Sequence, residues 1–222
     1  MPAAKLKDVF EQYRLLLKEI DSWFSGCLQR HSGRISCRSG CSACCRGLFD
    51  ITLLDALYLK EGLTGLDPAQ ADEVCSRSVK CLREASTRHP GFASPWLLNH
   101  LPEEQWDLIM PEDDETPCVL LGADGRCLVY EYRPMTCRLN GIPLIDTSGE
   151  ELFDDWCTLN FTDIDPSTLK DLRHPFNQLF AQELLLFREL IKRLTGQPRN
   201  ECDTVIPGAV LLDLERIIPI LK

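Results

Sequence analysis

The sequence has no long apolar run and no excess of positive charge, and both absences exclude classes of protein. No stretch of about 18 or more apolar residues occurs in the 222 residues, so the sequence predicts no membrane-spanning helix. Lys and Arg number 24 against 34 Asp and Glu, which gives a formal net charge of -10. An acidic surface repels nucleic-acid phosphates and anionic membranes. We therefore expect neither nucleic acid nor a membrane as a partner.

Several catalytic and nucleotide-binding motifs are also missing. The sequence contains no G-x-G-x-x-G after a predicted strand, no P-loop and no G-x-S-x-G elbow. Charged residues interleave the first 20 positions, unlike the apolar core of a secretory signal, so we expect a cytoplasmic protein. Hydrophobic residues make up 44% and charged residues 26%, proportions typical of a folded globular chain.

Helical patterns flank the centre of the chain. Apolar residues recur three and four positions apart from Lys5 to about Leu28, which predicts an amphipathic helix. Further helical sequence is expected at Leu53–Glu61, from Asp67-Pro68 towards Ser86, at Glu103–Ile109, from Asp165-Pro166, along the stripe from Phe176 to Leu194, and at Ala209–Ile218.

These patterns predict a mainly α fold, with a helical frame around an irregular Cys-rich metal-binding centre and a small β-hairpin. We expect one domain over residues 1–222. Its cysteine-cluster core covers about 34–160, with helical flanks at 5–28 and 165–222.

Cysteine is the unusual component of the sequence. Twelve residues are cysteine, a density below that of disulfide-stapled secreted scaffolds, and a reducing compartment keeps them as thiols. Metal binding is therefore the first hypothesis. A helix would hold the first group within about 100° of arc, although a knuckle at Gly40 leading into a helix at Cys41 is the better interpretation. This group, C-x3-C-x2-C-C, consists of Cys37, Cys41, Cys44 and Cys45.

A second group of cysteines follows a Pro-rich stretch, and comprises Cys118, Cys127, Cys137 and, further on, Cys157. Apolar runs on either side of residues 122–125 predict that two of them lie in the β-hairpin. Together the groups supply enough thiols for two four-cysteine sites, and soft sulfur donors prefer zinc, Cu(I) and iron–sulfur iron. The adjacent pair Cys44-Cys45 is awkward for a simple zinc knuckle and favours iron, with the two cysteines serving different metals or one polynuclear cluster.

The other cysteines, Cys27, Cys75, Cys81 and Cys202, are expected to be packing or incidental residues. Several arginines adjoin the predicted ligands, where a guanidinium group lowers thiol pKa values and donates hydrogen bonds to sulfur. Solvated surface arginines would explain the same pattern. They are Arg38, Arg46, Arg126 and Arg138.

The segment from Pro117 to Arg138 ends in the string Tyr-Glu-Tyr-Arg-Pro-Met-Thr-Cys-Arg and resembles the second signature of the YkgJ-like cysteine-cluster family. Residues 37–45 resemble its first signature, with a first spacing of three residues where the family more often has two. The resemblance implies zinc or iron chelation, often as an iron–sulfur cluster protein. It implies as ligands Cys37, Cys41, Cys44, Cys45, Cys118, Cys127 and Cys137, with Cys157 as a later cysteine of variable position.

The same resemblance makes Tyr130, Glu131, Arg133 and Arg138 candidates for orienting the cofactor. Pro134 can begin a short helix that presents Cys137 from its first turn, where the helix dipole favours a thiolate. The expected cofactor is an iron–sulfur cluster or iron, with zinc as the alternative.

The leading function is that of a metal-binding cysteine-cluster protein with a redox or metal-handling role, whose expected partners are metal ions. One alternative is a protein lysine N-methylase, because flagellin lysine N-methylases carry a related motif. Another is a structural zinc-binding interaction protein. Dithiol exchange at Cys41-x-x-Cys44 is a third alternative, weakened by the larger cluster around that pair.

Overall fold

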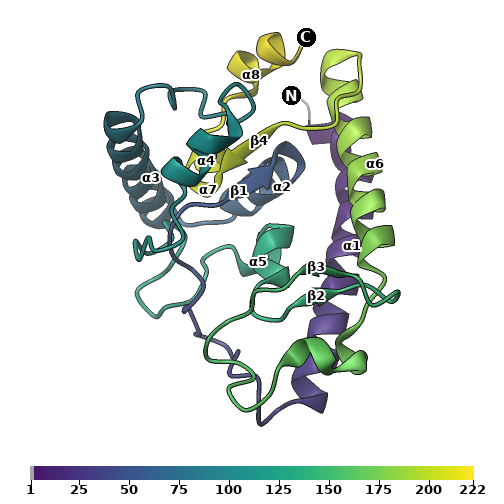
Figure 1. Ribbon diagram of the computed structural model, residues 1–222. Helices are drawn as coiled ribbons and strands as arrows, with labels where there is room; N and C mark the ends of the chain where they lie inside the picture. Colours follow the sequence, from purple (N-terminus) through teal and green to yellow (C-terminus); the bar gives the residue numbers. More distant parts are fainter. Residues whose placement is uncertain (1–2) are drawn as a thin grey trace.

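The computed structural model describes residues 3–222 as a mainly α fold with two small antiparallel sheets (Figure 1). Three short 3-10 turns complete the regular structure, at Tyr130–Tyr132, Pro166–Thr168 and Lys170–Leu172. The helices and strands are, in chain order, α1 (Ala3–Arg30), β1 (Asp50–Thr52), α2 (Leu53–Leu63), α3 (Pro68–Arg88), α4 (Glu103–Ile109), α5 (Met135–Leu139), β2 (Leu144–Ile145), β3 (Glu151–Phe153), α6 (Phe176–Thr195), β4 (Asp203–Val205), α7 (Ile206–Val210) and α8 (Leu214–Leu221).

The two longest helices, α1 and α6, lie side by side and antiparallel (Figure 1). Arg193 near the end of α6 pairs with Asp8 near the start of α1 at 2.5 Å, and Trp23 packs edge-on against Phe176 at the opposite end. The apolar stripe of α1 is buried in the main core, as its three-and-four spacing predicts. This pair forms one wall of the molecule.

The centre is a short sheet with α2 and α7 packed beside it. β1 pairs antiparallel with β4, with Ile51 opposite Thr204, and both side chains are buried. Thr52 caps α2, because its hydroxyl accepts a hydrogen bond from the Asp55 N–H at 3.1 Å. α1 and the last 20 residues both contribute side chains to the same core.

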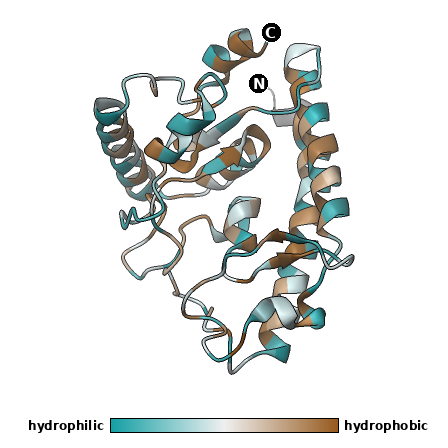
Figure 2. Ribbon diagram, in the orientation of Figure 1, coloured by the Kyte–Doolittle hydropathy of each residue, from teal (hydrophilic) through white to brown (hydrophobic). Residues whose placement is uncertain are grey.

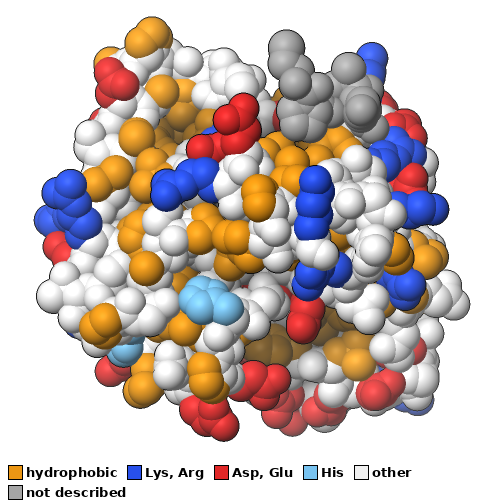
Figure 3. Space-filling model, turned by 90° about the horizontal axis from the view of Figure 1, so that it is seen from above, with side chains coloured by type: hydrophobic (Ala, Val, Ile, Leu, Met, Phe, Trp, Pro, Cys, Tyr) orange, Lys and Arg blue, Asp and Glu red, His pale blue; other side chains and the backbone are white. Residues whose placement is uncertain are grey.

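On the far side from α1, α3 packs against α7 (Figure 1). Asp67 caps α3 and Pro68 occupies its first turn, as predicted. The Pro-rich excursion with α4 follows and encloses a second, smaller apolar cluster around Phe92 and Ile109. The upper face carries Lys and Arg interleaved with apolar side chains, and acidic side chains gather along its lower edge in this view (Figure 3).

The lower half holds α5 and the sheet of β2 and β3. Leu144 and Ile145 are buried, and Figure 2 shows the apolar character of these strands. Pro134 precedes α5 and Cys137 lies within it, which confirms the expected short helix. Among residues 3–222, no helix combines the length and the apolar character needed to cross a membrane.

Four local expectations are wrong. Residues 118–130 form two turns joined by one isolated bridge, Leu121 to Cys127, and the extended hairpin is that of β2 and β3. No helix begins at Cys41, where the chain makes turns instead. Residues from Pro166 form two 3-10 turns rather than an α-helix. The last helix is divided into α7 and α8 at Leu211–Asp213, because Asp213 caps a new helix through the Glu215 N–H.

Candidate metal centre

The two cysteine-bearing segments, distant in sequence, meet along their backbones. The Cys118 N–H donates a hydrogen bond to the Cys45 carbonyl at 2.9 Å. One step further on, the Gly47 N–H donates to the Thr116 carbonyl at 2.8 Å, and Arg46 bridges Pro117. These bonds place the end of the first cysteine group directly beside the start of the second.

The other end of the first group is held by residues that follow Cys157. The Ser36 N–H donates to the Asn160 side-chain oxygen at 2.8 Å, and the Asn160 amide donates to the Cys37 sulfur at 3.4 Å. Asn160 is fully buried and also donates to the Gly141 carbonyl at 2.7 Å. A single asparagine therefore ties Cys37 to the segment that carries Cys157.

Four thiols interact around this asparagine, and we call them the open set. Burial raises the pKa of Cys37, the Asn160 hydrogen bond opposes that shift, and the neighbouring thiols of the set raise the pKa further. A cavity of about 320 Å³ lies against the set. Cys44, which is exposed, and Cys157 both line this cavity together with Trp156. The open set consists of Cys37, Cys41, Cys44 and Cys157.

Three thiols of the second group lie close together at α5, and with Cys45, whose carbonyl accepts the Cys118 N–H, they form what we call the closed set. Burial raises the pKa of Cys137 well above its usual value, and the charges of Cys118 and Cys127 raise it further. Burial also raises the pKa of Cys118 to about 11. All three pack against the main core. The closed set consists of Cys45, Cys118, Cys127 and Cys137.

The two sets touch at the adjacent pair. A hydrogen bond between the Cys44 and Cys45 thiols raises the pKa of Cys44. Through this contact and the Cys45-to-Cys118 backbone bond, the eight predicted ligands form one continuous region.

The chemistry of these donors fits a soft metal ion. The two sets supply eight thiol sulfur atoms, the kind of donor that zinc and iron–sulfur iron prefer. No group of three or more His, Cys, Asp or Glu side chains among residues 3–222 is arranged to hold an ion with the side chains as they stand. Closing either set around an ion therefore requires side-chain rotation and loss of the thiol protons.

A buried carboxylate supports the helix that carries Cys137. Asp55 of α2 is 1% exposed and accepts hydrogen bonds from the Tyr13 hydroxyl at 2.5 Å and the Met135 N–H at 2.9 Å. Burial raises the pKa of Asp55, and these hydrogen bonds oppose the shift. Because Met135 is the first residue of α5, Asp55 satisfies an amide that the helix leaves unpaired. Asp55 thus joins α1, α2 and α5 behind the closed set.

The two arginines of the family string anchor α5 to α1. Arg138 is 5% exposed, pairs with Asp21 and donates to the backbone carbonyls of Arg133 and Glu131. Arg133 pairs with Asp21 at 3.1 Å, and its guanidinium lies 4.1 Å from the centre of the Tyr130 ring.

These cations also face the sulfur atoms. The charge of Arg133 lowers the pKa values of Cys44, Cys127 and Cys137 against the effect of burial, and Arg138 does so for Cys127. Arg133 therefore acts on members of both sets. Tyr130 is 53% exposed and meets Arg133 rather than a thiol.

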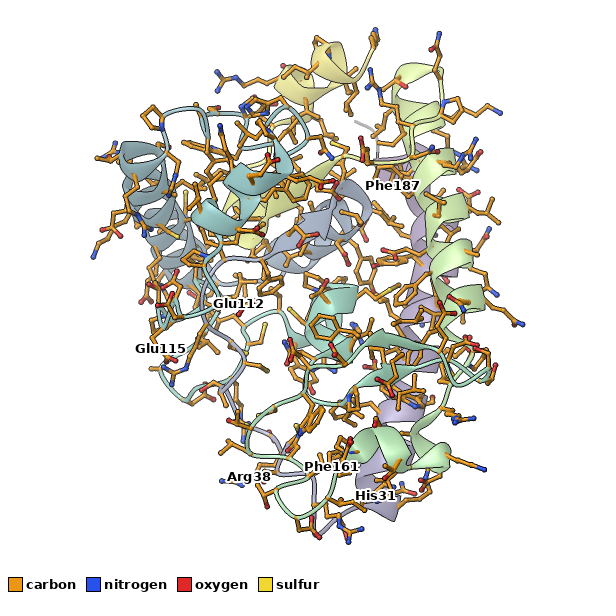
Figure 4. All side chains as sticks on the ribbon, viewed as in Figure 1. His31, Arg38, Glu112, Glu115, Phe161 and Phe187 are labelled. Atoms are coloured by element: carbon orange, nitrogen blue, oxygen red, sulfur yellow. The ribbon has the colours of Figure 1, made fainter. Side chains whose placement is uncertain are left out.

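The remaining arginines lie at the surface. Arg38 is exposed and points outwards near the end of the molecule marked by His31 and Phe161 (Figure 4). Arg46 pairs with Glu115, and Arg126 lies 3.7 Å from Asp124. Arg46 and Arg126 therefore fit the alternative of solvated surface arginines rather than arginines that act on the thiols.

The four cysteines outside the predicted ligand set have different surroundings. Cys27 and Cys202 are buried in the core, as expected of packing residues. Cys75 is exposed on α3. Cys81 lines a cavity of about 20 Å³ together with Cys118, a proximity that the sequence did not reveal. All twelve cysteines are free thiols.

Sequence reasoning also missed the residues that hold the sets in place: Asp21, Asp55, Tyr13 and Asn160. Their partners lie more than 40 positions away, so no local motif marks them. A polar residue within an otherwise apolar helical segment, such as Asp55 between Leu54 and Ala56, is the only signal that could have indicated one of them.

The central part of the chain matches a known family model. A model described as "Putative zinc- or iron-chelating domain", named CxxCxxCC, matches residues 36–158, which is more than half of the sequence and includes all eight predicted ligands. No curated protein and no solved structure matches the chain.

Proposed function

Because the chain belongs to the CxxCxxCC family, we propose that it binds iron through eight cysteines divided between the open and the closed set. The family model supports chelation of zinc or iron in general. The division into two four-thiol sets and the choice of iron are our own.

One observation carries the proposal. The backbone bond between Cys118 and Cys45, together with the Asn160 bridge to Cys37, brings thiols from both segments into a single region. A stretch of cysteines serving only as packing residues would not need these cross-links, whereas metal ligands must converge.

The contact between the sets favours iron over structural zinc. Separate structural zinc ions gain nothing from adjacency, while neighbouring iron–sulfur centres exchange electrons over short distances. The thiols of Cys44 and Cys45, which we assign to different sets, are hydrogen-bonded to each other. Iron bound here would supply one-electron redox chemistry, and the chain would fix its ligands and tune it through Arg133.

The compartment follows from the same thiols. All twelve cysteines are free, and thiols persist in the reducing cytoplasm. We therefore propose that the protein acts there.

Metal analysis of anaerobically purified protein tests the proposal. We expect iron with acid-labile sulfide and visible absorption. If the protein is colourless and carries zinc, the bound metal is zinc rather than iron and the redox role is excluded. If the protein takes up no metal, the proposal itself is overturned.

Two cysteine substitutions test the assignment of ligands. Cys44→Ser should lower the metal content, because Cys44 belongs to the open set. Cys75→Ser is the matched control, since Cys75 is also exposed but lies on α3 away from both sets. Equal metal loss in the two variants would contradict the division of the cysteines.

A further inference from the structure

The cavity beside the open set has a composition that suits an incoming cation. Its volume of about 320 Å³ is ten times or more what one water molecule needs. Two thiols, Cys44 and Cys157, form part of its wall, and the carboxylate residue Asp155 lies at the same wall. The cavity therefore joins soft sulfur ligands, a negative charge and open solvent.

The cavity beside the closed set is much smaller. It measures about 20 Å³, room for a single water molecule, and is lined by Cys118 and Cys81 among apolar residues such as Val119 and Ile206. Cys118, Cys127 and Cys137 pack against the main core, as Cys37 of the open set does, and Cys44 is the one exposed thiol of the eight. An ion held by the closed set would have to cross packed side chains to leave.

We propose that the cavity lined by Cys44, Cys157 and Asp155 is the route by which a soft divalent metal ion reaches and leaves the open set, while the closed set retains its ion. This inference rests on the proposed function, since it requires that both sets bind metal. It adds that the two sets behave differently: the open set exchanges its ion and the closed set keeps its ion.

Loading of a single ion, without sulfide, balances in protons and charge. The ion arrives hydrated, attracted by the Asp155 carboxylate, and each thiol that binds it releases one proton to the solvent. Release reverses these steps, as an external chelator takes the ion and the thiols regain their protons. Asp155 raises the rate at which the ion arrives, but it does not bind the ion in the loaded site, where the four ligands are cysteine sulfurs.

Zinc release measures the difference between the sets. The full-length protein is loaded with Zn²⁺ under anaerobic conditions and mixed with an excess of the chromogenic chelator pyridylazoresorcinol. We expect two phases of equal amplitude, because the chelator reaches an ion beside the open cavity more readily than an ion held among packed side chains.

A cavity-filling variant assigns the fast phase. Ala43 is exposed and lines the cavity, so Ala43→Phe should slow the fast phase and leave the slow phase unchanged. Ala123→Phe is the matched control, because Ala123 is equally exposed but lies in the turn near the closed set. A fast phase unaffected by Ala43→Phe would overturn the assignment of the route.

The outcomes separate this inference from the proposed function. Two equivalents of Zn²⁺ released at one common rate would overturn the inference and leave metal binding by both sets standing. A protein that binds no Zn²⁺ would overturn both.

A second pair of variants does not depend on tolerance of a bulky side chain. Asp155→Asn should slow Zn²⁺ loading at low salt about 15-fold, the effect of one unit charge on a divalent ion some 5 Å away in water. Asp154→Asn, next to it but outside the cavity wall, should leave the rate unchanged. Equal effects of the two substitutions would contradict a specific role for Asp155.

Discussion

The open and closed sets differ in how the rest of the chain supports them. Cys137 of the closed set lies in α5, which Asp55 and Asp21 tie to the helical frame. The first three cysteines of the open set lie in a segment of turns, and Cys157 follows β3. Ligands on packed helices hold their geometry when an ion leaves, whereas ligands on loops move more easily. Of the eight predicted ligands only Cys137 lies in a helix, so on the proposed division the closed set has one rigidly held ligand that the open set lacks.

The largest expected effect is the loss of Asp55 behind the closed set. Asp55→Ala should lower the free energy of unfolding by about 3 kcal/mol, because the Tyr13 hydroxyl and the Met135 N–H lose a buried acceptor and each unpaired donor costs roughly 1–3 kcal/mol. Urea unfolding measures this loss, and metal analysis should show that the closed set loses its ion first.

The control for this change is Asp72→Ala, an exposed position on α3 that should alter stability by less than about 0.5 kcal/mol. If Asp55→Ala empties the open set and spares the closed one, the structural basis of the comparison is wrong.

The next effect concerns the open set. Gly141 has φ 108°, a conformation that favours glycine, and a Cβ added there would lie 3.4 Å from the Cys37 sulfur. Gly141→Ala should cost about 1–3 kcal/mol in strain and lower metal binding by the open set. Gly33→Ala has open space around it and serves as the control. Unchanged metal content in the Gly141 variant would show that Cys37 does not depend on this loop.

Arg133 should affect both sets, because its charge reaches Cys44 as well as Cys127 and Cys137. Arg133→Ala should lower metal affinity at each set about tenfold, the lower end of the range for residues that support metal ligands. Competition with a chelator of known affinity measures the change. Arg126→Ala, at an exposed arginine beside Asp124, should have no effect. If Arg133→Ala lowers metal affinity at one set only, the charge of Arg133 does not act on both sets, and the prediction is wrong.

The smallest effect is a pH dependence behind the closed set. Burial and the charges of Asp55 and Asp203 raise the pKa of Glu183 on α6 to about 8, above its value near 4.5 in an unfolded chain. The folded state therefore holds this proton more tightly, and stability falls as the pH rises from about 4.5 to 8.

Glu183→Gln removes the titration, so the variant should gain stability over the unsubstituted protein as the pH rises through this window, by about 1 kcal/mol at pH 8 after allowance for solvent screening. Unfolding curves at pH 5 and pH 8 measure the difference. Glu112→Gln, in the exposed acidic loop, is the control (Figure 4). If the stability advantage of Glu183→Gln over the unsubstituted protein shrinks towards pH 8, the predicted direction of the pH dependence is wrong.

Local signals in the sequence predicted much of the helical frame. The stripe of α1, the Asp67-Pro68 start of α3 and the Pro134 start of α5 each depend on residues within a turn or two of one another. The prediction of a hairpin around residues 122–125 is wrong. The turn is present, but the backbone of Cys118 pairs with Cys45 rather than continuing a strand.

The site was predicted as a set of ligands but not as an arrangement. Cysteine spacing identifies thiols that gather, yet it does not reveal that Cys37 is tied to Asn160 or that Cys45 borders Cys118. Those relations arise from packing between segments far apart in the chain, which no local pattern encodes.

Pulsed alkylation of the metal-loaded protein tests the central claim most directly. A short exposure to iodoacetamide, followed by mass spectrometry, reports the protection of each thiol. The account predicts that all eight cysteines of the two sets react more slowly than the exposed Cys75 while metal is bound, and that removal of the metal speeds the reaction of the exposed Cys44 most, because Cys118, Cys127 and Cys137 also pack against the main core. Alkylation of Cys44 and Cys127 as fast as Cys75, with metal still bound, would contradict it.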